Sequence, residues 1–204
     1  SVDPHEITPD LVDLFSSHPV VCRHVHIPLQ SGSDRVLERM RRGYNRDQFM
    51  DIVRRLRERV PEIAITTDIM VGFPGETEED FEQTLDLTRE AGFSRIHVFP
   101  YSKRAGTRAA RFPGQIPSDV KESRSRRLIE LGYALAEEFH RSLVGRVVEV
   151  LVEEEQDGCA EGHTDNYVKV SFSAPPTDLV GEIVPVRVLR SGREGVSGEL
   201  AEGR

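Results

Sequence analysis

The chain has 204 residues, of which 37% are hydrophobic and 30% are charged. This balance is typical of a folded globular protein and not of a disordered one, and no apolar run reaches the roughly 20 residues of a membrane-spanning helix. The formal net charge is −8, of which −6 falls in residues 145–204. Any binding of nucleic acid must therefore depend on local basic patches.

Cys22 and Cys159 are the two cysteines of the chain. They match neither a disulfide framework nor a metal-binding spacing, and the N-terminus has no secretory signal pattern. We therefore expect a cytoplasmic protein that does not span a membrane and has no metal site of its own. The first residue is Ser1, without an initiator Met, which suggests a fragment of a longer protein.

Three strand–turn–helix units follow one another after a short helix over 9–16. Strands are predicted over 22–29, 63–71 and 94–101, and helices over 35–42, 45–60 and 78–91. The 63–71 segment is apolar at nearly every position, which is typical of a parallel strand covered on both faces. The sequence therefore predicts the α/β class, with right-handed βα crossovers.

Glycine-rich or polar turns follow each predicted strand. Gly72-Phe-Pro-Gly75 is the sharpest of them, and Thr77 then caps the next helix. The other two turns begin at Gln30 and at Ser102. Because parallel strands end at one edge of a sheet, where α/β proteins build ligand sites, we expect the three turns to meet there.

The pattern changes after a long helix predicted over 118–142. Five short segments with a period of two follow, over 147–153, 159–163, 167–172, 182–189 and 195–200. Short strands separated by Gly, Pro and Asp turns predict a small closed β-barrel. The domains are therefore predicted at 1–144 and 145–204.

Three motifs, in the correct order, resemble those of the radical SAM methylthiotransferases. They are His26-Ile-Pro-Leu-Gln-Ser-Gly-Ser-Asp34, the run from Thr67 to Phe81, and Tyr101-Ser-Lys-Arg-Ala-Gly-Thr107. The terminal barrel is similar to the TRAM domain of this family, so the resemblance covers nearly the whole chain. It implies a partial radical SAM (β/α) barrel, its last three βα units, followed by TRAM.

Within the family, the chain is most similar to the MtaB branch at 99–102, 113–115 and 163–167. That branch adds a methylthio group to C2 of N6-threonylcarbamoyladenosine at position 37 of tRNA. The alternatives are the branches acting on a ribosomal protein or on isopentenyladenosine in tRNA. A non-catalytic RNA-binding module is the alternative from another class.

The resemblance also implies S-adenosyl-L-methionine and two [4Fe–4S] clusters as cofactors of the parent enzyme. The family holds these clusters with three cysteines of an N-terminal domain and with a CxxxCxxC loop, neither of which is in this sequence. Two separated cysteines cannot replace them. We therefore assign no catalytic residue to this chain and expect it to be inactive alone.

Residues at the predicted strand ends are candidates for binding S-adenosylmethionine. By resemblance, Gln30, Ser31 and Ser33 face its ribose or methionyl part, with capping of the next helix as the alternative for Ser33 and Asp34. Asp68 is a carboxylate within an apolar strand, so it contacts the cofactor or pairs with a nearby Arg. Gly72 would shape the rim of the site. The adenine would lie against Val98, Phe99 and Tyr101, with core packing as the alternative for the first two.

Basic and aromatic residues are candidates for binding the anticodon stem-loop of tRNA. The loop after the third strand contains Lys103, Arg104, Arg108 and Arg111 without an acidic residue, and such cations can neutralise phosphates. In the barrel, the candidates are Tyr167, Lys169, Arg187 and Arg190. Because a partial barrel leaves a sheet edge exposed, we also expect self-association.

Overall fold

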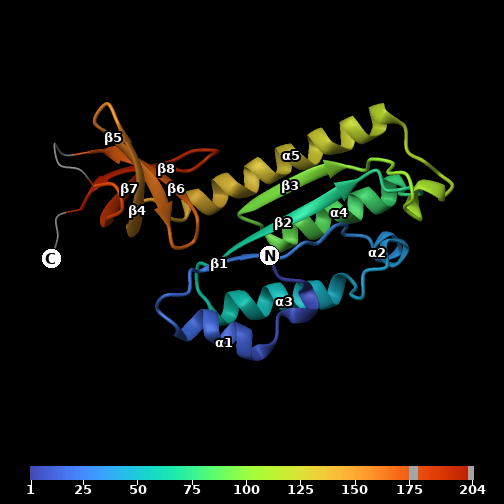
Figure 1. The fold of residues 1–204 in the computed structure, drawn as a ribbon, viewed down its shortest axis with the longest axis horizontal. Helices are drawn as coiled ribbons and strands as arrows, with labels where there is room; N and C mark the ends of the chain where they lie inside the picture. Colours follow the sequence, from blue (N-terminus) through green and yellow to red (C-terminus); the bar gives the residue numbers. More distant parts are fainter. Residues whose placement is uncertain (175–178, 202–204) are drawn as a thin grey trace. The chain divides into compact units, whose positions relative to one another are not determined.

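The computed structural model describes residues 1–174 and 179–201. The chain divides into two compact units, one formed by Ser1–His18 with Val25–Leu135 and the other by Pro19–His24 with Ala136–Arg204 (Figure 1). The division therefore falls inside a helix that continues through residue 135, somewhat before the boundary that the sequence suggests. Each unit has a hydrophobic core of its own.

The first unit is built on a three-stranded sheet. Its strands are β1 (His24–His26), β2 (Ala64–Val71) and β3 (Arg95–Pro100), in the order β1-β2-β3. Strands β2 and β3 are parallel from the pair Thr66–Arg95 to the pair Val71–Pro100. The three expected strands are thus confirmed, although β1 is shorter than predicted. Pro28 has no N–H to donate, so pairing past β1 continues only through isolated backbone bonds such as Ile27 N–H to the Thr66 carbonyl.

Four of the five α-helices within the described residues have a capping side chain at their start. The bounds of the five are α1 (Pro9–Ser17), α2 (Asp34–Met40), α3 (Arg46–Arg59), α4 (Glu78–Ala91) and α5 (Ser118–Arg141). The first four are preceded by Thr8, Ser33, Asn45 and Thr77, and each of these side chains accepts a hydrogen bond from a free backbone N–H of the first turn. No helix within the described residues is long and apolar enough to cross a membrane.

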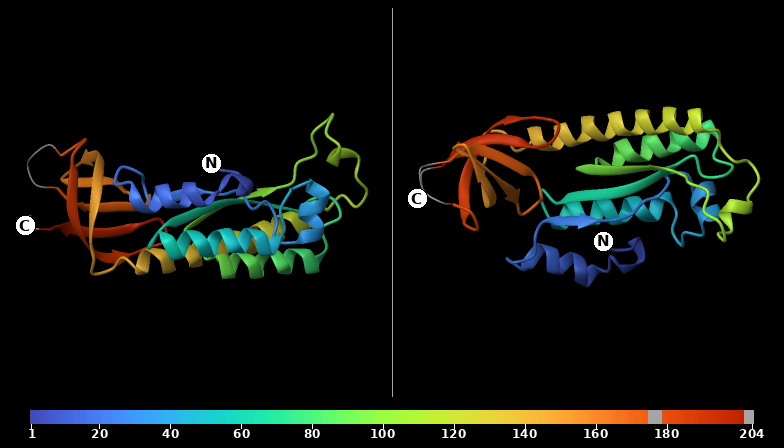
Figure 2. Two further views of the ribbon diagram at one scale, coloured as in Figure 1. Left: turned by 90° about the horizontal axis from the view of Figure 1, so that it is seen from below. Right: turned by 45° about the horizontal axis from the view of Figure 1, so that its top comes forward.

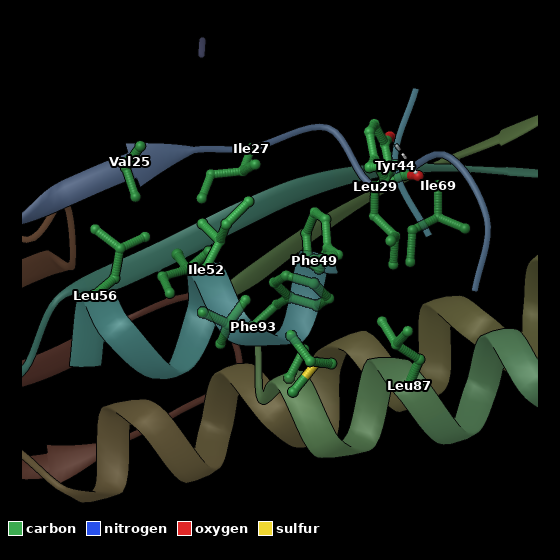
Figure 3. Packing of buried hydrophobic residues seen from close by; sticks show 14 of the residues in the cluster. Val25, Ile27, Leu29, Tyr44, Phe49, Ile52, Leu56, Ile69, Leu87 and Phe93 are labelled. Carbon is green, nitrogen blue, oxygen red and sulfur yellow. Dashed lines mark hydrogen bonds between the residues drawn. The ribbon is translucent and has the colours of Figure 1, made fainter. Parts of the chain in front are cut away.

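The main core lies on one face of the sheet. Helices α3, α4 and the first part of α5 run along this face (Figure 2), and Phe49, Ile52 and Leu56 of α3 pack beneath Val25 and Ile69 of the strands (Figure 3). In β2 the odd-numbered residues from Ile65 to Val71 are buried, whereas Thr66, Asp68 and Met70 remain partly exposed on the other face. The prediction that this strand is covered on both faces was therefore wrong within the described residues. Its second face, called the inner face below, is open.

The second unit contains the predicted closed barrel. Its strands are β4 (Val147–Gln156), β5 (Cys159–Thr164), β6 (Lys169–Ser173), β7 (Ile183–Ser191) and β8 (Val196–Leu200), closed in the order β4-β5-β6-β8-β7. All neighbouring pairs are antiparallel except β6 and β8. Val150, Val170 and Val186 fill the interior. Gly162 lets β4 and β5 approach closely, because a Cβ there would lie 1.9 Å from the Leu151 carbonyl oxygen.

Candidate functional site

The turns after the three strands meet at the carboxyl end of the sheet. Gln30 donates its backbone N–H to the Asp68 carbonyl at 2.8 Å and accepts from Met70 N–H at 2.9 Å. Tyr101 N–H donates to the Val71 carbonyl at 2.8 Å. Gln30, Asp68 and the loop that begins at Tyr101 are therefore neighbours on adjacent strands, as their position at parallel strand ends predicts.

Asp68 lies on the inner face between two histidines. Its Oδ1 is 3.5 Å from His26 Nε2 on β1 and 3.3 Å from His97 Nδ1 on β3. His26 is oriented by a 3.0 Å contact between its Nδ1 and Thr66 Oγ1. The same Asp68 oxygen is buried and makes no hydrogen bond of acceptable geometry within the described residues. An unsatisfied carboxylate oxygen on an open face is a position where a cationic ligand would be stabilised.

Gln30 has an unusual backbone conformation. Its φ is 66°, in the left-handed region that glycine favours. Such a conformation costs about 1–2 kcal/mol for a residue with a Cβ, and strain of this kind is often retained at functional sites. It directs the Gln30 side chain into a cavity of 310 Å³ at the carboxyl end of the sheet.

This cavity has an apolar side formed by Met40, Met70, Phe73 and Phe112. Phe73 packs edge-on against Phe112 and against Tyr101, with ring centroids 6.1 and 5.5 Å apart. The hydroxyl of Tyr101 is buried without a hydrogen-bond partner among the described residues. The site therefore combines aromatic surface with uncommitted polar atoms, an arrangement typical of small-molecule pockets.

Four arginines form the other side of the cavity. Arg39, Arg41 and Arg42 come from the end of α2 and the residues after it, and Arg108 comes from the loop after β3. Arg39 donates to the Pro74 carbonyl at 3.1 Å and lies over the ring of Phe112 at 5.3 Å. It therefore links α2 to the Gly72–Gly75 turn and to the loop.

Glu76 holds the Gly72–Gly75 turn from inside the protein. Its Oε2 accepts hydrogen bonds from the N–H groups of Gly72 at 2.5 Å and Phe73 at 3.0 Å, and its Oε1 lies 3.3 Å from Arg124 Nη1 of α5. Burial raises the pKa of Glu76 to about 7, against the opposing effects of Arg124 and the two N–H groups. Gly72 has φ 73° and is packed against the Lys121 side chain, so it shapes this turn.

Asp80 connects the first two turns. It accepts hydrogen bonds from Ser33 Oγ at 2.7 Å, from Thr77 Oγ1 at 2.7 Å and from Arg35. Burial opposes its ionisation, but the hydrogen bonds from Arg35, Ser33 and Thr77 outweigh burial and hold the pKa of Asp80 below its ordinary value. Ser33 also caps α2, as the alternative interpretation of this residue predicts.

Of the residues proposed to bind the cofactor, Gln30 lines this cavity and the others are not among its lining residues. Ser31 is buried, with its Oγ 3.5 Å from Thr84 Oγ1 of α4 and 3.2 Å from Ser33 N, so it supports the turn. Val98 packs against the helix-covered core. Phe99 lies on the inner face, where it pairs in register with Met70 and is 44% exposed. Neighbouring residues of one strand thus face opposite sides of the sheet.

Sequence reasoning missed several residues of this region. His97 is in register with Asp68 on the neighbouring strand, a relation that becomes visible only after the two strands are aligned. Arg41 and Arg42 looked like ordinary basic residues at the end of a helix. Glu76 is one of several acidic residues that follow the turn, so the sequence does not single it out. It differs from the others in its position, because it lies next to Gly75 and before the helix begins.

The loop after β3 contains four exposed basic residues. Lys103, Arg104, Arg108 and Arg111 are all exposed, and within the described residues none forms an ion pair. Figure 1 shows this loop extending beyond the strand ends, at the same end of the sheet as α2. These side chains are therefore available to anions.

The barrel candidates differ in their accessibility. Tyr167 is 62% exposed, has φ 60° and stacks on His24 with ring centroids 4.5 Å apart. Lys169 Nζ is instead bound to Glu161 Oε2 at 2.7 Å. Arg187 and Arg190 are exposed on β7. Tyr167 and the two arginines thus present accessible side chains, whereas Lys169 is already paired.

Within residues 1–174 and 179–201, no group of three or more His, Cys, Asp and Glu side chains is placed to hold a metal ion. Both cysteines are exposed and free. The inner face fits S-adenosylmethionine better than it fits a cluster, because an unsatisfied carboxylate oxygen and a glutamine suit a cationic, hydrogen-bonding ligand, whereas iron–sulfur clusters require thiolates.

Two family models match separate parts of the chain. The model of the radical SAM superfamily matches residues 1–88, and the TRAM domain model matches residues 141–200. Among solved structures, coproporphyrinogen III oxidase (HemN) from Escherichia coli, a radical SAM enzyme, is similar with a TM-score of 0.53 and 18% sequence identity, over 80% of this chain and 45% of that chain. This likeness supports the fold alone.

Curated relatives match the chain along most of its length. The tRNA-2-methylthio-N(6)-dimethylallyladenosine synthase of Aquifex aeolicus is 43% identical over 199 residues, which is 98% of this chain and 45% of the relative. The threonylcarbamoyladenosine tRNA methylthiotransferase MtaB of Bacillus subtilis is 42% identical, over 94% of this chain and 44% of the relative. The chain thus spans less than half the length of these relatives.

Proposed function

Because this chain belongs to the radical SAM methylthiotransferase family with a TRAM domain, we propose that it forms the carboxyl-terminal part of an enzyme that methylthiolates an adenosine in tRNA. The sheet with α2 to α5 would be the last three βα units of the catalytic barrel, and the β4–β8 barrel would contact RNA. The chain alone would be inactive, since the ligands of the iron–sulfur clusters would come from other parts of the enzyme.

The observation that carries this proposal is the environment of Asp68. S-Adenosylmethionine has a positive sulfonium and a positive ammonium group, and Asp68 lies on the inner face with an Oδ1 that has no hydrogen bond among the described residues. Gln30 stands at the next strand end and supplies an amide for hydroxyl or carboxylate groups. When bound, the cofactor would supply the radical chemistry, and these side chains would orient it.

We assign N6-threonylcarbamoyladenosine at position 37, in the anticodon stem-loop, as the modified nucleoside. The support is the sequence resemblance at 99–102, 113–115 and 163–167 and the similarity to the B. subtilis relative with that activity. A second candidate is N6-dimethylallyladenosine. It is favoured by the names of the relatives from A. aeolicus and Moorella thermoacetica, the latter 42% identical over 203 residues.

Nucleoside analysis of tRNA separates these candidates. The gene containing this reading frame would be deleted, and total tRNA would be digested and examined by liquid chromatography and mass spectrometry. Selective loss of the methylthio form of N6-threonylcarbamoyladenosine is the expected result. Loss of the methylthio form of N6-dimethylallyladenosine would reassign the substrate. If both nucleosides persist at wild-type levels, the proposed function is wrong.

A further inference from the structure

Arginines without acidic partners gather around the 310 Å³ cavity. Six of the other thirteen arginines of the first unit are paired with acids within the described residues, as Arg35 is with Asp80, Arg54 with Glu90 and Arg124 with Glu76, and none of the remaining seven lines this cavity. By contrast, Arg41, Arg42 and Arg108 have no ion pair within the described residues. This concentration of unpaired positive charge occurs in a chain with a net charge of −8.

A structural explanation accounts for only part of this arrangement. Arg41 and Arg42 follow the last turn of α2, where cations interact favourably with the helix dipole by about 0.3–1 kcal/mol. That effect does not explain why Arg108, which comes from a loop more than sixty residues later, lines the same cavity. Nor does it explain why no acidic residue is among the residues that line it.

The charge of the cavity also argues against S-adenosylmethionine as its occupant. The cofactor has a net positive charge at neutral pH, since its sulfonium and ammonium outweigh its carboxylate. Four guanidinium groups would repel it, while guanidinium groups bind phosphate through paired hydrogen bonds. The acidic Asp68 on the inner face and the basic cavity at the strand ends therefore suit ligands of opposite charge.

The apolar side of the cavity suits a nucleobase. Phe73 and Phe112 present aromatic surface beside Met40 and Met70, and bases stack on such side chains with little dependence on sequence. Pockets for small molecules begin at about 300 Å³, so a cavity of 310 Å³ has room for one nucleotide unit.

We propose that this cavity binds one nucleotide of the RNA substrate, with its phosphate held by Arg41, Arg42 and Arg108 and its base against Phe73 and Phe112. This inference rests on the proposed function, because it assumes an RNA ligand. It goes further by locating a subsite that includes the residues after α2, whereas the loop cations Lys103, Arg104 and Arg111 contact neighbouring phosphates.

The test measures binding of a fluorescein-labelled RNA stem-loop with unpaired adenosines by fluorescence anisotropy. The variants are Arg42→Ala and the double variant Arg41→Ala/Arg42→Ala, and the matched control is Arg126→Ala, which removes an exposed arginine of α5 that has no ion pair within the described residues. At low salt we expect about a tenfold loss for Arg42→Ala. Each lost phosphate contact should also reduce the slope of log affinity against log salt by about 0.7.

The base contact is tested separately with Phe112→Leu. This variant keeps an apolar side chain beside Arg39 but removes the aromatic face, and stacking on such a face contributes enough for about a fivefold loss or more. The salt slope should stay that of the wild type, because no cation is removed. Thermal unfolding of every variant identifies any loss of binding that comes from misfolding.

The outcomes distinguish the subsite from the function on which it rests. If the wild type does not bind RNA, both the proposed function and the subsite are wrong for this chain. If the wild type binds, and Lys103→Ala/Arg104→Ala weakens binding while the Arg41 and Arg42 variants do not, the subsite alone is wrong. A loss of S-adenosylmethionine affinity in Arg42→Ala, with RNA affinity unchanged, would assign the cavity to the cofactor and overturn the proposal.

Discussion

Glu76 holds its proton more tightly in the folded protein than in the unfolded chain. Its pKa is raised from 4.5 to about 7 by burial, so the folded state binds more protons than the unfolded state between these values. Its contribution to stability is therefore fully present below pH 4.5 and is lost as the pH rises through 7. At about 1.4 kcal/mol per pKa unit, we expect a decrease of about 3 kcal/mol in the free energy of unfolding over this range.

The measurement compares the wild type with Glu76→Gln by urea denaturation at a series of pH values. The variant should lack this decrease, because its amide does not titrate. The quantity to compare is the difference in the free energy of unfolding between the two proteins at each pH, because the titration of His140 changes this free energy in the opposite direction in both of them. Burial lowers the pKa of His140, so its contribution is lost as the pH falls below 6.5. Parallel curves for both proteins would contradict the assignment to Glu76.

Asp68 provides a prediction about cofactor binding. Replacing it with Asn keeps the size of the side chain but removes the charge, so the attraction for a sulfonium or ammonium group is lost. We expect S-adenosylmethionine to bind at least tenfold more weakly to Asp68→Asn, since hydrogen bonds to charged groups contribute about 1.5–3 kcal/mol. Isothermal titration calorimetry measures the affinity of the wild type and of the variant for S-adenosylmethionine.

The control for Asp68 is Asp86→Asn, which removes an exposed carboxylate of α4 that pairs with Arg89. It should bind the cofactor as the wild type does. Equal affinity of Asp68→Asn and the wild type would mean that the histidines on either side satisfy Asp68 and that the carboxylate has a structural role.

At the scale of elements, Gly32 explains why the turn after β1 has the sequence Ser-Gly-Ser. A Cβ at this position would lie 2.5 Å from Thr84 Cα and 2.9 Å from the Gln83 carbonyl oxygen of α4. These are backbone atoms that cannot move aside without shifting the helix. We therefore expect Gly32→Ala to lower the free energy of unfolding by about 2–3 kcal/mol, measured by chemical denaturation.

Gly132 offers a matched substitution with the opposite expected sign. It lies inside α5, and a Cβ there would meet only Ile96 side-chain atoms at 3.5 Å, an ordinary contact. Gly132→Ala should stabilise the protein by about 0.5–1 kcal/mol, because alanine has less conformational freedom to lose in a helix. Destabilisation of similar size by both variants would mean that the close approach at Gly32 is not the cause.

The helices and strands were predictable where their bounds depend on residues that are close in sequence. The helices predicted over 9–16, 45–60 and 78–91 begin and end within about two residues of α1, α3 and α4. The length of β1 was not predictable, because it depends on Pro28 and on the left-handed conformation of Gln30. A period of two in the last sixty residues predicted short strands, and the barrel closure observed between β4 and β7 depends on pairing distant in sequence.

The candidate site was predictable only as a set of strand ends. The pairing of parallel strands brings the backbones of Gln30, Asp68 and Tyr101 close together, independently of where their side chains point. Because side chains alternate along β3, Phe99 faces the inner side and Val98 faces the core. The sequence alone does not tell which of these two neighbours faces which side. The arginine cavity combines residues separated by about seventy positions, so no local pattern reveals it.

For the whole molecule, the open sheet predicts self-association. Within the described residues, β3 has a strand neighbour on only one side, and Phe99 is 44% exposed on the inner face. An unpaired edge next to exposed aromatic surface favours pairing with a second copy. Light scattering should show a mass above that of the monomer at high protein concentration and a monomer for Phe99→Glu. A monomer at all concentrations for the wild type would refute this prediction.

Unpaired arginines at the cavity also affect how the protein behaves during purification. Contacts between guanidinium groups and phosphates weaken steeply as salt increases, whereas the buried apolar cores of both units depend little on ionic strength. Lysates prepared in dilute buffer should therefore yield material with excess absorbance from co-purified nucleic acid. A concentrated-salt wash should remove that contaminant and leave a folded polypeptide behind.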